Sequence, residues 1–325
     1  MIDKYNRRLN YLRVSITDHC NLRCIYCMSR DSVTKLLHKE ILRYEEILRI
    51  IKTGVRLGIS KVRITGGEPL VRRDICGFLS RLNAIDGLSD ISLTTNGVLL
   101  LENIDKIKSA GIKRINISLD TLDRHKFKKI TGHNFFQKVI EGIKRALDLD
   151  FYPIKLNVVV LNGINDNEIL DFAGLTFSYP FQVRFIEYMP IGTACMSDRR
   201  HILAPEVKDR ISVLGDLVPV DKEFDDGPAE LFKLKGAKGE IGLIHPISRH
   251  FCATCNRLRL TASGRLMPCL LSDVYFDIKG PLRKGCSDND LADIFLNAAY
   301  NKPSSHHLAM NNQPPVPGRM SAIGG

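Results

Sequence analysis

The feature that most limits the fold of this chain is a regular alternation of short β-rich runs with segments of helical period. In one such segment Ile47, Ile51 and Val55 recur at four-residue spacing, which is typical of the buried face of an amphipathic helix. A repeated β–α order predicts parallel strands joined by right-handed helical crossovers. The predicted strands are Leu12–Ile16, Lys61–Thr65, Ile91–Thr94, Arg114–Ser118, Lys155–Leu161 and Gln182–Ile186.

Polar or turn-forming residues follow each of these predicted strands. Because the carboxyl ends of parallel strands meet at one end of the sheet, and chemistry collects there, we expect a single site built from these segments. In strand order, the segments are a group of three cysteines, Gly66–Pro69, Thr95–Gly97, Asp120, Asn162–Gly163 and Tyr188–Pro190.

The alternation stops near Gly192, and the rest of the chain has a different composition. Short β-rich runs with glycine turns extend from Leu231 to Leu270, which is typical of an appended region and not of another β–α unit. From Asn301 on, the chain is rich in Pro, Asn and Ser, which predicts a flexible tail. We therefore predict a core of residues 1–192, a C-terminal region of residues 193–300 and a tail of residues 301–325.

Charge and hydropathy limit the partners. Lys plus Arg number 47 against 36 Asp plus Glu, so the net charge of +11 favours an anionic partner without choosing one. The basic residues are scattered with little aromatic interleaving, so we expect no nucleic acid partner. No apolar run approaches the ~20 residues that span a bilayer, and charges occupy the region where a signal peptide is apolar. We expect a cytoplasmic protein with no membrane partner.

Three cysteines near the start of the chain, Cys20, Cys24 and Cys27, have the spacing Cys-x3-Cys-x2-Cys. A clustered, odd set of cysteines in a chain without a secretory signal favours metal ligation over disulfides. A four-iron cluster normally takes four thiolates, so three would leave one iron open to another ligand. A zinc site completed by His19, or a redox dithiol, stays open at this point.

A second group consists of Cys252, Cys255 and Cys269. A cysteine pair, a glycine turn and a third cysteine are also typical of a zinc ribbon, with His245 or His250 as a fourth ligand. From spacing alone, zinc is the favoured metal here. Three thiolates suit either zinc or an iron–sulfur cluster.

Two arginines follow the second cysteine pair at alternate positions, Arg257 and Arg259. Alternate positions of a strand share one face, so both guanidinium groups are expected on the same side. Paired guanidinium groups beside a metal suit the recognition of an anion or a purine edge. A solvated strand face is the other interpretation.

The motif CNLRCIYC, followed by the strand-end GGEP, resembles the radical S-adenosylmethionine (SAM) superfamily. More narrowly, KVRITGGEPLVRRD, TTNG, INISLDTL, RFIEYMPIG, DGPA and FCATCNRLRLTASGRLMPCL are similar to the GTP 3′,8-cyclase family of molybdenum cofactor biosynthesis. The resemblance runs from Leu12 to Leu270 and includes the terminal Gly-Gly. It implies an α/β fold, a partial (β/α)6 barrel of TIM type, with a C-terminal extension that carries a second iron–sulfur site.

The resemblance implies two [4Fe–4S] clusters, one on each cysteine group, and SAM as a second cofactor. SAM would bind the open iron of the first cluster, and the guanine of the substrate GTP would bind that of the second. The implied enzyme is a lyase: a 5′-deoxyadenosyl radical takes the ribose C3′ hydrogen, and the carbon radical attacks guanine C8. The product would be (8S)-3′,8-cyclo-7,8-dihydroguanosine 5′-triphosphate.

Site residues are implied position by position. A triphosphate carries about four negative charges, so several converging cations are expected. A glycine at position 67 has a physical reason, because backbone approaches a ligand closely where no side chain intervenes. The resemblance assigns Tyr26, Gly67, Ser118 and Met189 to SAM; Arg13, Arg63, Thr94, Lys155, Arg257, Leu258 and Arg259 to GTP; and Arg257, Arg259, Gly324 and Gly325 to catalysis.

Partners follow from the resemblance as well. It implies an electron-donor protein and, as a functional partner, the cyclic pyranopterin monophosphate synthase that uses the product, and it leaves a homodimer open. Two other hypotheses remain at this point. A peptide-modifying radical SAM enzyme also carries extra C-terminal cysteines and predicts no affinity for GTP. A non-catalytic zinc protein that binds nucleic acid predicts binding that falls steeply with salt.

Overall fold

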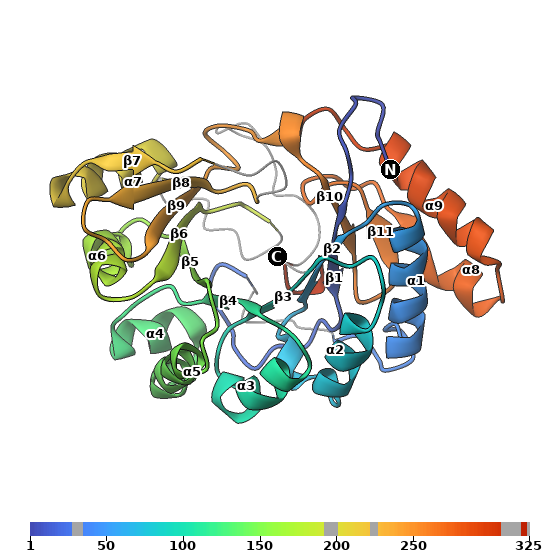
Figure 1. The fold of residues 1–325 in the computed structure, drawn as a ribbon, viewed down its shortest axis with the longest axis horizontal. Helices are drawn as coiled ribbons and strands as arrows, with labels where there is room; N and C mark the ends of the chain where they lie inside the picture. Colours follow the sequence, from blue (N-terminus) through green and yellow to red (C-terminus); the bar gives the residue numbers. More distant parts are fainter. Residues whose placement is uncertain (28–34, 192–200, 222–226, 307–319, 324–325) are drawn as a thin grey trace.

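A computed structural model describes residues 1–27, 35–191, 201–221, 227–306 and 320–323 (Figure 1). All six predicted strands are confirmed, and none of their ends is displaced by more than one residue. They are β1 (Tyr11–Ser15), β2 (Lys61–Thr65), β3 (Asp90–Thr95), β4 (Arg114–Ser118), β5 (Ile154–Val160) and β6 (Phe181–Glu187).

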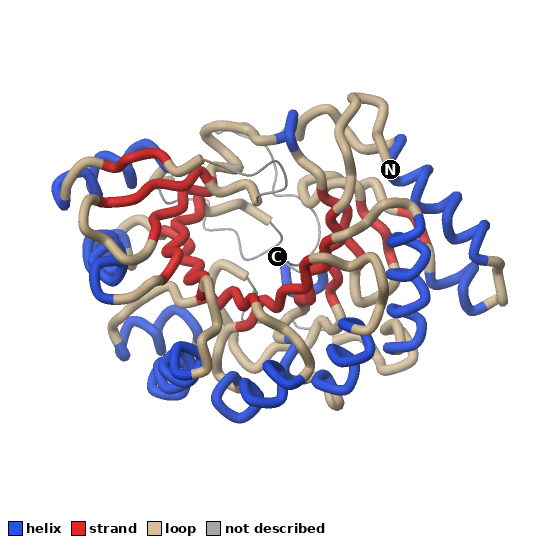
Figure 2. Tube along the Cα trace, viewed as in Figure 1, coloured by secondary structure: helices blue, strands red, loops and turns tan. Residues whose placement is uncertain are grey.

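Helices follow these strands and lie outside the curved sheet (Figure 2). The longest have 13 residues, and among the described residues no helix is long and apolar enough to cross a membrane. The helices between and after the six strands are α1 (Tyr44–Arg56), α2 (Ile75–Asn83), α3 (Leu100–Ser109), α4 (Arg124–Thr131), α5 (Phe136–Asp148) and α6 (Ile169–Ser178).

The C-terminal region continues the same sheet at both edges. The strand order in the described residues is β12-β11-β10-β1-β2-β3-β4-β5-β6-β9-β8-β7, and β10 and β9 run parallel to β1 and β6. The predicted boundary after residue 192 falls in a stretch outside the described residues. The further elements are α7 (Ala204–Ile211), β7 (Leu217–Pro219), β8 (Glu230–Leu234), β9 (Glu240–Ile244), β10 (Arg257–Leu260), β11 (Arg265–Met267), β12 (Phe276–Asp277), α8 (Lys279–Arg283), α9 (Asp288–Tyr300) and α10 (Met320–Ile323).

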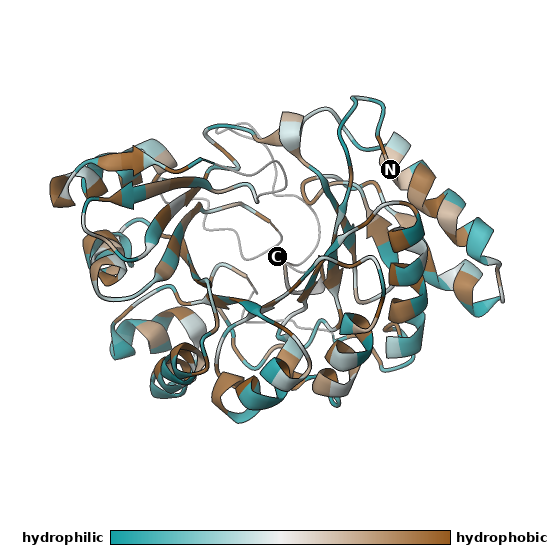
Figure 3. Cartoon of the chain, viewed as in Figure 1, coloured by the Kyte–Doolittle hydropathy of each residue, from teal (hydrophilic) through white to brown (hydrophobic). Residues whose placement is uncertain are grey.

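The two faces of the sheet have opposite polarity. In β1, Leu12 and Val14 are fully buried in the hydrophobic core, whereas Arg13 lines a central cavity. In β2, Ile64 is fully buried, whereas Arg63 lines the cavity. Alternate side chains of a strand point to opposite faces, so this pattern places the apolar core under the helices and leaves polar groups inside the ring (Figure 3).

The predicted tail is attached to the body at its start. The side chain of Lys302 is buried, and Arg7 donates hydrogen bonds to the backbone carbonyls of Pro303 and Ser304 at 2.7 and 3.2 Å. The first residues of the predicted tail thus have hydrogen-bond partners that composition does not reveal, and the flexibility of the tail stays a prediction. The α10 helix lies inside the ring of strands in Figure 1, and Met320 lines the cavity.

Candidate active site

The strands surround a cavity of about 300 Å³, which is lined by residues near the carboxyl ends of β2 to β6 and by Tyr11 and Arg257, the first residues of β1 and β10. Both cysteine groups line it, although they lie more than 220 positions apart in the sequence. Lys155 and Leu258 do not line it, and Gly324 and Gly325 lie outside the described residues. The other predicted site residues all do: Arg13, Cys20, Cys24, Tyr26, Cys27, Arg63, Gly67, Thr94, Ser118, Met189, Cys252, Cys255, Arg257, Arg259 and Cys269.

The loop with the first cysteine group is fixed by backbone hydrogen bonds. The N–H groups of Arg23 and Ile25 donate to the carbonyls of Thr131 and Ile130 at the end of α4, at 2.8 and 2.9 Å. The Leu22 N–H donates to the sulfur of Cys20 at 3.4 Å. The loop is therefore held between β1 and α4 with its thiols toward the cavity.

The three thiols of this group fit a cationic metal centre. Burial raises the pKa of the Cys24 thiol well above its ordinary value, and the nearby charges of Cys27, Asp120 and Cys20 raise this pKa further. Three thiolates can therefore be held together here only when positive charge compensates them, and bound iron supplies such charge. Three sulfur donors on one cavity wall are the ligands that a [4Fe–4S] cluster takes from a protein when one iron stays open.

The GGEP motif packs directly against this loop. The N–H groups of Gly67 and Glu68 donate to the carbonyls of Thr17 and His19 at 2.6 and 2.7 Å. A Cβ atom at position 67 would overlap the carbonyl oxygen of His19 and lie 2.7 Å from that of Asp18. The structure therefore gives a second reason for Gly67 besides contact with a ligand: the chain that leads into the cysteines passes too close for any side chain.

Replacing Gly67 with alanine is expected to displace the cysteine loop, because the overlapping atoms are backbone atoms that cannot rotate away. We expect a loss of about 2 kcal/mol in unfolding free energy and a reconstituted chain without iron on the first group. Gly174→Ala is a matched control, since a Cβ there meets nothing within 4 Å, and helix propensity favours alanine in α6 by about 0.5–1 kcal/mol. Normal iron content in Gly67→Ala would contradict this explanation.

Hydrogen bonds link Glu68 through Asn96 to Cys20. The carboxylate of Glu68 accepts hydrogen bonds from Leu70 N–H, the Thr95 hydroxyl and Asn96 N–H at 3.0, 2.8 and 2.6 Å. The amide nitrogen of Asn96 lies 3.6 Å from the sulfur of Cys20. Burial raises the pKa of Glu68 to about 7 although these bonds oppose the rise. Neither side chain is assigned a role by the resemblance, although GGEP and TTNG contain them.

Tyr26 is joined to the fourth and fifth strands through Asp120. Its hydroxyl donates to Asp120 at 2.6 Å, and the backbone N–H of Val159 donates to the other carboxylate oxygen at 2.9 Å. Burial raises the pKa of Asp120 from its ordinary value of 3.8 to about 6. The spacing of the cysteine motif does not identify this partner, which follows β4 and lies 94 residues further along the chain.

The raised pKa of Asp120 predicts a pH-dependent stability of the iron-free chain. A carboxyl whose pKa is raised by folding stabilises the fold below its ordinary pKa of 3.8, and this contribution is lost as the pH rises through about 6. Asp120→Asn removes the titration and keeps a polar group in place. Its unfolding free energy relative to the natural chain should therefore rise by up to about 3 kcal/mol between pH 4 and pH 7. Urea unfolding measures the difference, and a constant difference would contradict the assignment.

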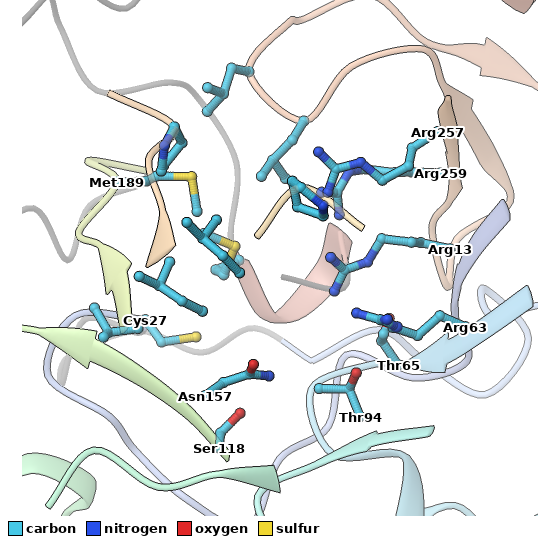
Figure 4. A pocket seen from close by; sticks show the side chains of 18 of the residues that line it. Arg13, Cys27, Arg63, Thr65, Thr94, Ser118, Asn157, Met189, Arg257 and Arg259 are labelled. Atoms are coloured by element: carbon cyan, nitrogen blue, oxygen red, sulfur yellow. The ribbon is translucent and has the colours of Figure 1, made fainter. Parts of the chain in front are cut away.

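Arginines from three adjacent strands form one wall of the cavity. Arg259, Arg13 and Arg63 are partners in register on β10, β1 and β2. Together with Arg257 they enter the cavity from one side, with Cys27 on the opposite side (Figure 4). Burial and the neighbouring arginines lower the pKa of Arg13, and burial and Arg257 lower that of Arg259 to about 10. This repulsion makes the wall suited to an anionic ligand.

Lys155 lies close to these arginines, but its side chain does not line the cavity. Its side chain is buried, and burial together with Arg184, Arg114 and Arg63 lowers its pKa to about 6. Asn157, two residues later on β5, and Arg184 on the adjacent strand β6 do line the cavity. The period of two along each strand is the signal that would have identified both residues.

The second cysteine group lies beside the arginine wall. The Cys255 N–H donates to the carbonyl of Cys252 at 3.2 Å. Burial opposes ionisation of Cys255, but Arg257 and Lys302 outweigh it and lower the pKa of this thiol to about 6. At neutral pH Cys255 is therefore mainly the thiolate, which is the form that binds metals. Lys302 lines the cavity and was not identified from the sequence.

None of the three histidines considered as zinc ligands lines the cavity. His19 lies 3.8 Å from Asp18, His245 lies 3.5 Å from Glu230, and His250 pairs with His306 at 2.9 Å. In the part of the chain that the structure describes, no three His, Cys, Asp or Glu side chains are arranged to hold a single metal ion.

Comparison with known proteins places the chain among relatives of high identity. It is 49% identical over 325 residues to a GTP 3′,8-cyclase of Moorella thermoacetica and 48% identical over 327 residues to one of Thermodesulfovibrio yellowstonii, with the whole of each chain covered. The chain belongs to the GTP 3′,8-cyclase family. Residues 14–176 match the Radical SAM superfamily, and residues 181–308 match Molybdenum Cofactor Synthesis C.

Solved structures with the same fold include SuiB of Streptococcus suis bound to S-adenosylmethionine. Its TM-score is 0.62 at 16% identity, with 90% of this chain and 67% of that chain covered. SuiB bound to the precursor peptide SuiA gives the same TM-score and identity. Identity this low shows a shared fold only. Membership in the GTP 3′,8-cyclase family confirms the predicted α/β radical SAM fold, and the superfamily implies a [4Fe–4S] cluster and SAM.

Proposed function

We propose that this chain is a GTP 3′,8-cyclase of molybdenum cofactor biosynthesis that uses two [4Fe–4S] clusters and SAM. The observation that carries the proposal is that one cavity is lined by both cysteine groups and by the arginine wall of Arg13, Arg63, Arg257 and Arg259. A radical enzyme acting on a nucleoside triphosphate needs a cluster, space for SAM and cations for the phosphates in one place, and this cavity offers all three.

In this proposal Cys20, Cys24 and Cys27 hold the first cluster. The bound cluster and SAM supply the 5′-deoxyadenosyl radical that takes the hydrogen from the ribose C3′. The chain itself positions SAM: Tyr26 and Gly67 lie on the cysteine side of the cavity, and Ser118 and Met189 follow from β4 and the end of β6. The cavity wall also keeps water away from the reacting atoms.

The arginine wall binds the triphosphate of GTP. The four guanidinium groups repel one another when no anion is present, and the phosphate oxygens replace this repulsion with charge-assisted hydrogen bonds. Thr94 adds a hydroxyl from β3, and phosphates bound nearby would raise the lowered pKa of Lys155 and so favour its charged form. Leu258 is fully buried, so its contribution to GTP binding would come from its backbone.

In this proposal the second cysteine group would hold the second cluster, which would supply iron for binding the guanine base. Cys252, Cys255 and Cys269 line the cavity beside Arg257 and Arg259. Binding of the base at this end of the cavity would fix its orientation relative to the ribose. The proposal assigns Arg257 and Arg259 to the orientation of GTP during the reaction.

The end of the chain completes the site. Gly324 and Gly325 are proposed to enter the cavity, because a tip without side chains fits a crowded pocket. The position of Met320 on the cavity wall supports this role. Replacing both glycines with alanine should stop cyclisation, and unchanged cyclisation would mean that the tip is inert.

Further partners belong to the proposal alone. The chain requires an electron-donor protein to reduce the first cluster, and its product is the substrate of cyclic pyranopterin monophosphate synthase. A sedimentation measurement would give its assembly state and show whether it forms a homodimer.

The test of this function is anaerobic reconstitution, followed by iron, sulfide and zinc analysis and by incubation with SAM, a reductant and GTP. We expect about eight irons per chain and formation of 5′-deoxyadenosine only when GTP is present. Zinc on the second cysteine group would contradict the proposed binding of guanine. Formation of 5′-deoxyadenosine with a peptide and not with GTP would favour a peptide-modifying enzyme instead.

A further inference from the structure

We propose that Lys302 is a positioning residue of the second cysteine group. Its ammonium group joins the two segments that carry Cys255 and Cys269 and supplies the positive charge that keeps their thiolates together beside an iron–sulfur cluster. The inference rests on the proposed function of this cysteine group as a cluster site.

Lys302 bridges the open end of the β10–β11 hairpin. The last paired residues of this hairpin are Arg259 and Met267. Beyond them, the ammonium of Lys302 donates to the backbone carbonyls of Arg257 at 2.8 Å and Pro268 at 2.6 Å. Arg257 lies two residues after Cys255, and Pro268 directly precedes Cys269. The side chain therefore sets the spacing of the two cysteines where the strands no longer pair.

The bridge is fixed from several sides. Lys302 is 2% exposed, and its backbone N–H donates to the carbonyl of Ala299 at the end of α9. Arg7 binds the next two carbonyls of this segment and also donates to the carbonyl of Cys252 at 2.7 Å. Two buried cations thus hold the backbone at or near all three cysteines of the group.

The charge of Lys302 needs an anionic partner. Burial of an ammonium group is costly unless it is paired, and two backbone carbonyls do not neutralise it. An ammonium has three N–H donors, and the carbonyls use two of them. The side chain lines the same cavity as Cys255 and Cys269, so the third donor is available to a sulfur atom of the bound cluster or of these thiolates. Reduction adds negative charge to a cluster, so the cation favours the reduced form.

The experiment isolates the second group in the full-length chain by replacing Cys20, Cys24 and Cys27 with alanine. In this background Lys302→Met is compared with Lys302→Arg and with Lys52→Met, which changes an exposed lysine on α1. After anaerobic reconstitution, iron per chain, the rate of iron loss to a chelator and the reduction potential are measured.

We expect Lys302→Met to lose iron about 10–100-fold faster than Lys52→Met and to shift the potential to more negative values. Lys302→Arg restores the charge and should recover most of the iron retention. Equal iron retention and potential in Lys302→Met and Lys52→Met would overturn the proposal. Equal rates of iron loss from Lys302→Met and Lys302→Arg would also overturn the proposal. This second comparison tests the proposal even if Lys302→Met folds poorly.

The same measurements separate this inference from the proposed activity. If the natural chain holds iron on the second group but yields no GTP-derived product, the proposed activity is contradicted. The role of Lys302 is then still decided by the iron retention and the reduction potential of the variants. Zinc on the second group would overturn both.

Discussion

Replacing Cys255 with alanine is expected to abolish cyclisation of GTP while leaving the first cluster in place. Cys255 is the thiol of its group that Arg257 and Lys302 favour as a thiolate, so its loss removes a strong iron ligand. Iron in the reconstituted chain should fall from about eight to about four per chain. SAM should still bind, because the first cysteine loop is fixed by α4 and the GGEP segment and not by the second group.

The control for this variant is Cys76→Ala, which removes a thiol on α2 that does not line the cavity. It should retain both the iron and the activity. Retention of full cyclisation by Cys255→Ala would show that the second cysteine group is not part of the reaction.

Replacing Arg13 with methionine is expected to have opposite effects on GTP binding and on stability. If Arg13 binds phosphate as proposed, its loss weakens GTP binding by about 30-fold or more, since such truncations cost about 2–5 kcal/mol. The iron-free chain should become more stable by about 1–3 kcal/mol, because Arg13 is half-buried and lies next to Arg259, Arg63 and Arg257, whose charges repel it. Calorimetric titration with GTP and urea unfolding measure the two effects.

Arg8→Met is the matched control, because Arg8 is exposed and does not line the cavity. Neither GTP binding nor stability should change appreciably. If Arg13→Met destabilised the chain and kept its affinity for GTP, Arg13 would be a structural residue and the arginine wall would not be the phosphate site.

Local sequence signals were sufficient to predict the six β–α units. Each strand is a short run of β-branched and apolar residues next to a helix with a clear four-residue period, so Lys61–Thr65 and Arg114–Ser118 were predicted with their observed ends. The cysteine groups were also recognisable from spacing alone. The first group follows β1, whereas Cys252 and Cys255 precede β10, whose first residue pairs with Tyr11 at the start of β1. The two groups therefore reach the cavity from opposite ends of the sheet, and only the fold shows that they share it.

Contacts between distant segments were not predictable in this way. Strands β9 and β10 extend the barrel sheet at opposite edges, although the glycine-rich sequence around them suggested an appended region. Lys302 occurs in a polar, proline-containing stretch that has no periodicity, and only the fold brings it to Arg257 and Pro268. Asp120, by contrast, was expected at the same end of the sheet as the cysteine loop because both follow parallel strands, and the structure adds its hydrogen bond with Tyr26.

The measurement that tests the central claim most directly uses GTP labelled with deuterium at the ribose C3′. The reconstituted chain is incubated with this substrate, SAM and a reductant, and the 5′-deoxyadenosine is analysed by mass spectrometry. We expect one deuterium in 5′-deoxyadenosine together with 3′,8-cyclo-7,8-dihydro-GTP as product. Unlabelled 5′-deoxyadenosine formed at the same rate with and without GTP would contradict that claim.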